Sequence, residues 1–237
     1  FAYLAGKTAV IADCDVDAAD MHLLTEPDFN ESGDFYSGEL ALINQELCIQ
    51  CEKCLNVCRF DAIERKNATL VINEVECEGC GYCKRVCPSD AIININRNVG
   101  QWFVSTIKTS SKMVHARLEI GADNSGKLVT HVKNTAKEIA LENNSEYVIV
   151  DGSPGVGCPV ISSLSGANYV VLITEPTISG LHDLKRVYKL VRKFNIKAGC
   201  VINKFGLNED ISAQILKFIS ENTIDLLGNI PYMTDFT

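Results

Sequence analysis

The sequence predicts an α/β fold in which a doubly wound, mostly parallel sheet carries a small cysteine-rich insertion. Three observations predict it. Outside the insertion, apolar runs alternate with amphipathic helical stretches; eight of the eleven cysteines fall in two runs of identical spacing; and polar residues follow several apolar runs. Alternating β and α segments indicate a parallel sheet covered by helices. Binding sites in such sheets lie where the strands end.

Composition narrows the class of protein. The chain has 237 residues, 46% of them hydrophobic, which suffices for one large domain or two small ones. Its formal net charge is −8, so no general attraction to nucleic acid is expected. No apolar run reaches the length of a membrane span, so no membrane insertion is expected either. The chain starts at Phe1 without a methionine, and we expect both ends to be cut.

Five apolar runs predict the parallel strands of the large domain. They are residues 8–15, 147–153, 169–176, 198–205 and 224–231. Their near-continuous apolar character is typical of strands that are covered on both faces. The helices expected between them are at about 126–142, 159–167, 179–194 and 208–222. A hairpin is expected near residues 101–120.

The two cysteine runs form an internal repeat. Residues 48–58 are "CIQCEKCLNVC" and residues 77–87 are "CEGCGYCKRVC", at an offset of 29 residues. The offset also relates the tripeptides at 61–63 and 90–92, which are both Asp-Ala-Ile. Structural zinc and disulfides are the alternatives, but zinc sites usually use two separated pairs of ligands. Tandem four-cysteine runs therefore favour iron–sulfur clusters.

About residues 44–96 resemble bacterial two-cluster ferredoxins. The resemblance implies that the fourth cysteine of each run binds the other cluster. The ligands implied for one [4Fe-4S] cluster are Cys48, Cys51, Cys54 and Cys87. Those implied for the second are Cys77, Cys80, Cys83 and Cys58. Pro88 follows Cys87 as in that family, whereas Arg59 stands at the equivalent place after Cys58.

Polar residues follow the apolar runs of the large domain. Asp13 and Asp15 end the first run, Asp151 ends the second, and Asn203-Lys204 ends the fourth. A charge after a buried run is costly. Helix capping accounts for one such aspartate, whereas several at one sheet edge favour a site for a metal and a phosphate.

The large domain resembles MinD/Mrp-type P-loop ATPases, related to the nitrogenase iron protein, and within them the members with an inserted two-cluster ferredoxin. The stretches that carry the resemblance are "IADCDVDAADMHLL", "MVHARLEIGADNSGKLV", "VIVDGSPGVGCPVISSLSGA", "EPTISGLHDL" and "VINK". It implies an ATPase domain over residues 1–43 and 97–237, incomplete at both ends, around an inserted domain at 44–96.

The resemblance also implies roles for single residues. Asp15 would lie near the γ-phosphate and the attacking water, as the catalytic residue, and Asp13 would help organise Mg²⁺. Asp151 would be the Walker-B aspartate, and the backbone of Gly155 would sense the γ-phosphate.

The base-binding residues implied by the resemblance lie further along the chain. Asn203 would hydrogen-bond the adenine with Lys204 beside it, and the backbone around Pro231 would pack on the base. Ala19-Asp20 stands where the family often has Pro-Asn, so the resemblance does not carry over a dimer contact there.

The phosphate-binding loop of that family is not found in the sequence. Gly6-Lys7-Thr8 precedes an apolar run rather than a helix, and "FAYLAG" predicts the end of a helix with Gly6 as its C-cap. We therefore expect the N-terminal strand and the P-loop upstream of Phe1.

A second P-loop-like stretch is "GADNSGKL" at 121–128. It lacks the Ser or Thr whose hydroxyl binds Mg²⁺, because Leu128 stands there. The preceding "HARLEI" alternates charged and apolar residues, unlike a central strand. We expect a helix N-cap at Asn124 or Ser125 instead.

Three cysteines lie outside the repeat. Cys14 and Cys200 fall inside apolar runs and are expected to be buried filling. Cys158 follows the glycine-rich stretch after the second strand, and either packs or faces a dimer partner or a cluster.

The function predicted is ATP-driven dimer switching, coupled to electron transfer through two [4Fe-4S] clusters to a redox partner protein. The cofactors are those clusters and ATP/ADP with Mg²⁺; the dimer would be a homodimer or a heterodimer with a paralogous ATPase, in the cytoplasm. Two alternatives stay open. One is an iron–sulfur carrier of the Mrp kind, whose usual C-terminal C-x-x-C pair is absent from this sequence. The other is a non-catalytic redox module, should the P-loop be missing.

Overall fold

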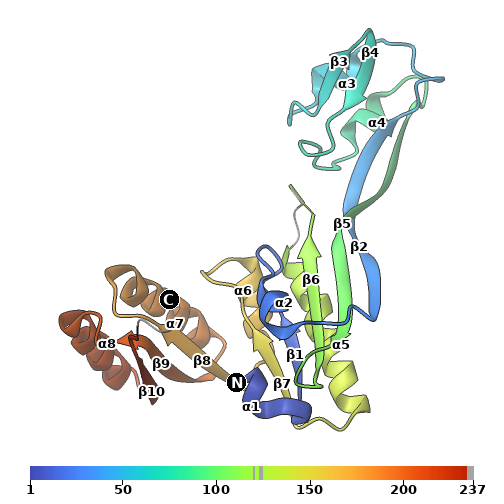
Figure 1. The fold of residues 1–237 in the computed structure, drawn as a ribbon. Helices are drawn as coiled ribbons and strands as arrows, with labels where there is room; N and C mark the ends of the chain where they lie inside the picture. The colour runs from blue at the N-terminus through green and yellow to red at the C-terminus, as the bar shows by residue number, and fades with distance from the viewer. Residues whose placement is uncertain (120, 123–124, 234–237) are drawn as a thin grey trace.

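The computed structural model describes residues 1–119, 121–122 and 125–233. Two long antiparallel strands, β2 (Glu31–Ile43) and β5 (Ile92–Thr106), leave the α/β part of the molecule and carry the cysteine-rich insertion at their far end (Figure 1). We call this pair the stalk. The insertion is therefore attached to the sheet by both of its ends.

The first sheet has five strands in the order β2-β5-β6-β1-β7. Its other strands are β1 (Ala9–Asp13), β6 (Lys112–Leu118) and β7 (Tyr147–Asp151). β1 runs parallel to β6 and β7, whereas β5 is antiparallel to β2 and β6. Helix α5 (Ser125–Glu142) covers this sheet with a fully buried stripe. The stripe comprises Leu128, Val129, Val132 and Ala136, at the spacing of one helix face.

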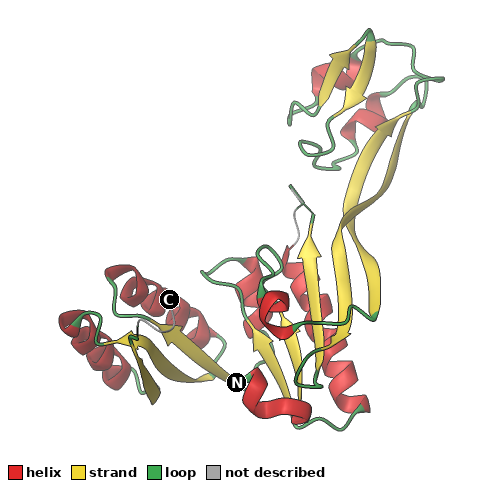
Figure 2. Ribbon diagram, viewed as in Figure 1, coloured by secondary structure: helices red, strands yellow, loops and turns green. Residues whose placement is uncertain are grey.

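The second sheet has three parallel strands in the order β10-β9-β8. These are β8 (Tyr169–Thr174), β9 (Lys197–Phe205) and β10 (Asp225–Pro231), with helices α7 (Ile178–Lys193) and α8 (Glu209–Glu221) packed against them (Figure 2). Both helices begin with a side-chain cap. The Gly180 N–H donates to Thr177 Oγ1 at 2.9 Å, and the Ile211 N–H donates to Asn208 Oδ1 at 3.0 Å, as N-cap residues do.

Short helices complete the α/β part. They are α1 (Ala2–Ala5), followed by a 3₁₀ turn at Gly6–Thr8, α2 (Met21–Thr25) and α6 (Cys158–Leu164). Gly6 caps α1 with a φ of +52°, and β1 follows the turn directly. The predicted helix end is confirmed, so Lys7 and Thr8 lead into a strand.

The predicted fold class is confirmed, with one correction to its strands. All five predicted strands and all four predicted helices form within a few residues of their expected bounds. However, β7 and β8 are edge strands of two separate sheets, not strands covered on both faces. Tyr147 on β7 is 58% exposed and Ile173 on β8 is 66% exposed. Apolar side chains stay in contact with water there because no strand lies beside either edge in the described part of the chain.

The expectation that residues 115–120 are unlike a central strand is wrong for residues 115–118, which belong to β6; residue 120 lies outside the described residues. β6 is a central strand, paired with β1 on one side and β5 on the other. Its residues from Met113 to Ala116 are buried, including His115. The charged residues that suggested otherwise stand at the end of the strand, where Arg117 is exposed.

The insertion contains α3 (Lys53–Val57), the hairpin of β3 (Ile63–Lys66) and β4 (Thr69–Ile72), and α4 (Tyr82–Val86). Its two repeats exchange equivalent backbone hydrogen bonds. The Asn44 N–H donates to Ala91 O, and the Asn73 N–H donates to Ala62 O, both at 2.7 Å. Each repeat is thus held by the other, as its sequence symmetry suggests.

Within the described residues, no helix combines the length and apolar character needed to cross a membrane.

Candidate functional site

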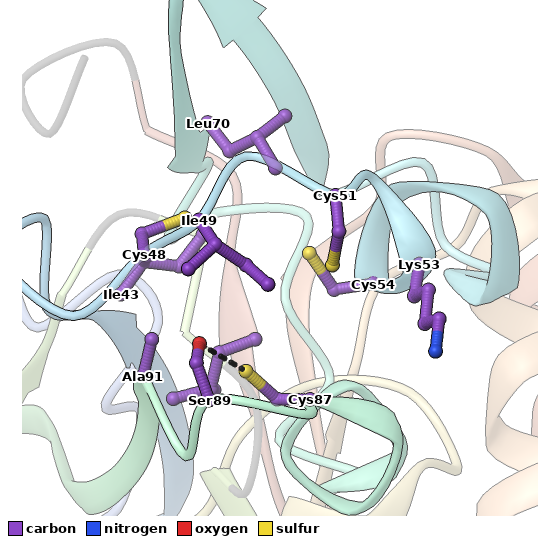
Figure 3. A pocket seen from close by; sticks show the side chains of 11 residues that line it. Ile43, Cys48, Ile49, Cys51, Lys53, Cys54, Leu70, Cys87, Ser89 and Ala91 are labelled. Carbon is purple, nitrogen blue, oxygen red and sulfur yellow. Dashed lines mark hydrogen bonds between the residues drawn. The ribbon is translucent and has the colours of Figure 1, made fainter.

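The first candidate site is a pocket in the insertion, drawn in Figure 3. Its volume is about 290 Å³, its mouth included, and four cysteines line it: Cys48, Cys51, Cys54 and Cys87. Ile43, Leu70 and Ile92 supply its apolar wall. Ser89 Oγ lies 3.7 Å from Cys87 Sγ, within hydrogen-bonding distance for sulfur. These are the four residues that the ferredoxin resemblance groups together.

The second candidate site is a pocket of about 380 Å³ in the same domain. It too is lined by four cysteines: Cys58, Cys77, Cys80 and Cys83. Three of them come from the second run and one from the first, the reverse of the first pocket. The grouping therefore matches the predicted second set, while the binding of a cluster by these residues stays a prediction.

Backbone conformation in the cysteine loops suits a bound cluster. In both repeats, the residues two and four places after the first cysteine have positive φ: Gln50 (57°), Glu52 (59°), Gly79 (62°) and Gly81 (70°). At Gly79 even a Cβ atom would overlap the carbonyl oxygen of Glu39 on the stalk. Each loop thus coils tightly, with its first three cysteines lining one of the two pockets. This arrangement fits a cube-shaped group held by four thiolates.

The thiols are spread out rather than gathered round one point. All eleven cysteines are free. Among the residues that the structure describes, no three His, Cys, Asp or Glu side chains lie close enough to hold a single metal ion. In a [4Fe-4S] cluster held by four thiolates, the irons and sulfides of the cluster lie between the thiolates.

The third candidate site is the carboxyl edge of the first sheet. Asp13 and Asp151 are register partners at the ends of the parallel strands β1 and β7. Asp13 is 2% exposed. Its Oδ1 accepts a hydrogen bond from the Asp15 N–H at 3.2 Å, whereas its Oδ2 is buried without a hydrogen-bond partner in the described structure. A buried carboxylate oxygen without a partner is costly, and a cation would satisfy it.

The charges at this edge raise one another's pKa values. Burial, together with the nearby carboxylates of Asp151 and Asp15, raises the pKa of Asp13 to about 6. The pKa of Asp151 is raised by partial desolvation and by the Asp15 charge. The pKa of Asp15 is raised by desolvation and by Asp17 and Asp20. Such clustering of raised carboxyl pKa values is typical of functional sites.

Ser153 ties together the two loops that follow β1 and β7. Its Oγ donates to the carbonyl of Cys14 at 2.7 Å, and the Cys14 N–H donates to Asp151 O at 2.9 Å. Ser153 also lies close to Asp15 and offsets part of the rise in the pKa of that carboxyl. No sequence pattern predicts a role for Ser153, although its position directly after Asp151-Gly152 was an available signal.

The predicted base-binding residues lie on the second sheet, apart from the carboxylates. Lys204 has a φ of +52°, its N–H donates to Asn203 Oδ1 at 3.0 Å, and its Nζ lies 2.7 Å from Glu175 Oε2. Pro231 ends β10 opposite Phe205. These residues share the carboxyl edge of that sheet. Gly155, with a φ of +92°, lies in the exposed loop after β7.

The remaining predictions concern the three cysteines outside the repeat and the stretch at 121–128. Cys14 and Cys200 are fully buried, as expected, whereas Cys158 is exposed. Ser125 is the first residue of helix α5 and therefore not its N-cap, so that prediction is wrong. The alternative N-cap, Asn124, lies outside the described residues. Leu128, at the position where a P-loop has its Ser or Thr, is fully buried in the core and offers no hydroxyl for Mg²⁺.

Comparisons with known proteins place this geometry in a family. The chain is 38% identical over 199 residues to the uncharacterised protein MJ0578 of Methanocaldococcus jannaschii, covering 84% of this chain and 68% of that protein. The chain belongs to the MJ0578 family. It is also 34% identical over 97 residues to the uncharacterised protein MJ0579 of that organism, covering 41% of this chain and 35% of that one.

One further match concerns the insertion and another concerns nearly the whole chain. Residues 41–95 match the family described as 4Fe-4S dicluster domain, which is the insertion with both cysteine runs. Among solved structures, the cell division ATPase MinD of Pyrococcus furiosus is similar over 97% of this chain and 72% of that one, at 15% identity and a TM-score of 0.48. The dicluster match supports [4Fe-4S] clusters as the groups that this member of the MJ0578 family binds.

Proposed function

We propose that this protein binds and hydrolyses ATP, and that the nucleotide state controls electron transfer through two [4Fe-4S] clusters to a partner protein. One observation carries the proposal. The stalk strands β2 and β5 connect the cysteine pockets to the α/β part. They belong to the same sheet as β1 and β7, which end at Asp13 and Asp151. A change at the carboxylate edge therefore has a continuous hydrogen-bonded route to the pockets.

The carboxylates support a Mg²⁺-nucleotide site. Mg²⁺ is usually held by one or two carboxylates together with water and substrate phosphates. The buried, unpartnered Oδ2 of Asp13 and the raised carboxyl pKa values at this edge favour such a cation. When bound, Mg²⁺ would neutralise charge on the phosphates. Asp15, on the loop beyond Asp13, would hold the attacking water.

Within the described residues, no strand pairs with the outer edge of β7 or of β8, and these free edges support a strand between the two sheets. Both are parallel-sheet edges with exposed apolar side chains, which soluble proteins normally cover. We propose that a strand preceding Phe1 in the complete protein pairs with both and opens into the phosphate-binding loop. It would bring Asn203 and Lys204 of the second sheet to the same nucleotide as Asp13 and Asp151.

A dimer is part of the proposal. The loop after β7 contains Gly155 and leads to the exposed Cys158. Two copies, or this chain and a paralogous ATPase, would meet across these loops when ATP is bound, and hydrolysis would release them. The redox partner would then receive electrons from the clusters.

The test is ATP hydrolysis by the complete protein. Asp15→Asn should lower kcat by roughly two to four orders of magnitude, the range typical of a residue that activates or orients a nucleophile. Asp183→Asn is the matched control, because Asp183 is an exposed aspartate on helix α7, outside the carboxylate edge. Equal rates for Asp15→Asn and the parent would remove Asp15 from the mechanism, and absence of hydrolysis in the parent would refute the ATPase.

A further inference from the structure

Arg97 joins the cysteine-rich insertion to the α/β part of the molecule. It lies on the stalk strand β5 and is half-buried. Its Nη1 donates to the carbonyl of Cys77 at 3.3 Å, and its Nη2 donates to the carbonyl of Gly121 at 3.1 Å. Cys77 begins the second cysteine run, and Gly121 lies between β6 and α5. One guanidinium thus bridges two loops that are far apart in the sequence.

This contact breaks the symmetry between the two cysteine pockets. Arg97 has no counterpart in the first repeat, where the residue at the same offset is Ala68. Among the described residues, no side chain donates to the carbonyl of Cys48, the equivalent of Cys77. A guanidinium is therefore hydrogen-bonded to the first cysteine loop residue of the second pocket only, whereas the charged side chains that line the pockets themselves are Lys53 in the first and Glu78 in the second.

We propose that Arg97 is a positioning residue for the second cluster and raises the reduction potential of that cluster. The proposal rests on the cluster ligands proposed above. Each one-electron reduction adds a negative charge to a cluster, and a nearby cation stabilises the reduced form. Hydrogen bonds and charge around the ligands are the usual means by which proteins set such potentials.

A hydrogen bond to the loop between β6 and α5 of the α/β part holds the Arg97 guanidinium in position. The Gly121 carbonyl accepts from Nη2, and a Cβ atom at Gly121 would lie 3.0 Å from Cγ1 of Val75 in the second cysteine loop. Arginine suits this place because its planar fork reaches two carbonyls at once, whereas lysine is a single mobile charge. We therefore expect lysine to replace arginine only in part.

The experiment uses the full chain with both clusters reconstituted without oxygen. Reductive titration with dithionite, followed by electron paramagnetic resonance, gives the midpoint potential of each cluster. Cys77→Ala and Cys48→Ala variants, which each lose one cluster, assign the signals. Arg97→Gln should shift the second cluster to a more negative potential and leave the first nearly unchanged, and Arg97→Lys should give a smaller shift.

Arg117→Gln is the matched control. It removes the same charge from an exposed position on the neighbouring strand β6, and neither potential should move. Unchanged potentials in Arg97→Gln, or equal shifts of both clusters, would overturn the proposed role of Arg97. Failure of the parent to take up two clusters would instead contradict the cluster ligands, so the two proposals fail in different ways.

Discussion

Asp13 and Asp151 are register partners at the ends of two neighbouring parallel strands, so that two carboxylates stand side by side at one sheet edge. Like charges held this close disfavour ionisation of both. Asp13 carries most of the penalty, because it is 2% exposed and one of its oxygens has no hydrogen-bond partner in the described structure. Without a cation, the ionised carboxylate of Asp13 therefore lowers the stability of the folded chain.

Asp13→Asn should stabilise the chain in EDTA above pH 6. The pKa of Asp13 is raised from 3.8 to about 6 in the folded state. The folded state therefore binds more protons than the unfolded state between these pH values, and stability falls as the pH rises through them. The cost above pH 6 is about 3 kcal/mol. Thermal unfolding at pH 8 should show the gain, and at pH 3.5 the gain should vanish.

The exposed residue Asp17 is the control for this substitution. Asp17→Asn should change the unfolding temperature little at either pH. If Asp13→Asn were less stable than the parent at pH 8, the ionised carboxylate of Asp13 would stabilise the fold. The expected cost of burying that carboxylate would then be wrong.

His115 should cause the opposite pH dependence. It is buried on β6, with its Nε2 2.9 Å from Ser105 Oγ and its ring stacked on Phe103. Burial lowers the pKa of His115 from 6.5 to about 4. The unfolded state therefore binds the extra proton first, and about 3 kcal/mol of stability is lost as the pH falls from 6.5 to 4.

His115→Phe should remove this acid-sensitive contribution. Its free energy of unfolding should change less between pH 6.5 and 4 than that of the parent, although Ser105 loses a partner, which costs about 1–3 kcal/mol at all pH values. Chemical denaturation across that pH range measures both effects. His182→Phe, at an exposed position of α7, is the control and should leave the pH dependence of the parent unchanged. If the free energy of unfolding of His115→Phe fell with pH as steeply as that of the parent, His115 would not be the source of the acid sensitivity.

The mixed ligand sets of the two pockets can be tested with single cysteine variants. Cys87→Ala should lose the same cluster as Cys48→Ala, because both residues line the first pocket. Cys58→Ala should lose the same cluster as Cys77→Ala, because both line the second. Iron content and electron paramagnetic resonance of the remaining cluster distinguish the two pairs. Cys158→Ala should keep both clusters; a match between Cys87→Ala and Cys77→Ala would mean that each run binds its own cluster.

Local patterns predicted the elements of this fold, whereas the order of its strands depended on distant contacts. The apolar runs and caps located β1 and β7–β10 because strand and helix periodicity is local. The central place of β6 was missed, since its burial comes from β1 and β5 rather than from its own alternation. The exposure of Ile173 was missed for the same reason: whether a strand lies at an edge is set by its neighbours.

The site residues divide in the same way. The resemblance to two-cluster ferredoxins groups the cysteines in the same two sets that line the two pockets, and their role as cluster ligands stays a prediction. The carboxylates were located because parallel strands end at one edge. Arg97 gave no sequence signal, because its two acceptors, Cys77 and Gly121, lie 20 and 24 residues away in the chain. Only the pairing of the stalk strands brings the three together.

Gly79→Ala should selectively weaken the second cluster. Gly79 has a φ of +62°, and a Cβ atom there would overlap the carbonyl oxygen of Glu39. A left-handed conformation costs a non-glycine residue about 1–2 kcal/mol, and the overlap adds to this because a stalk backbone atom has to move. Gln50, the equivalent residue in the first repeat, already has positive φ with a side chain. Gln50→Gly should therefore change stability by less than about 1 kcal/mol and retain both clusters. Iron content and spectra of the two variants after identical reconstitution make the comparison, and full loading of both clusters in Gly79→Ala would show that the stalk yields to the added methyl group.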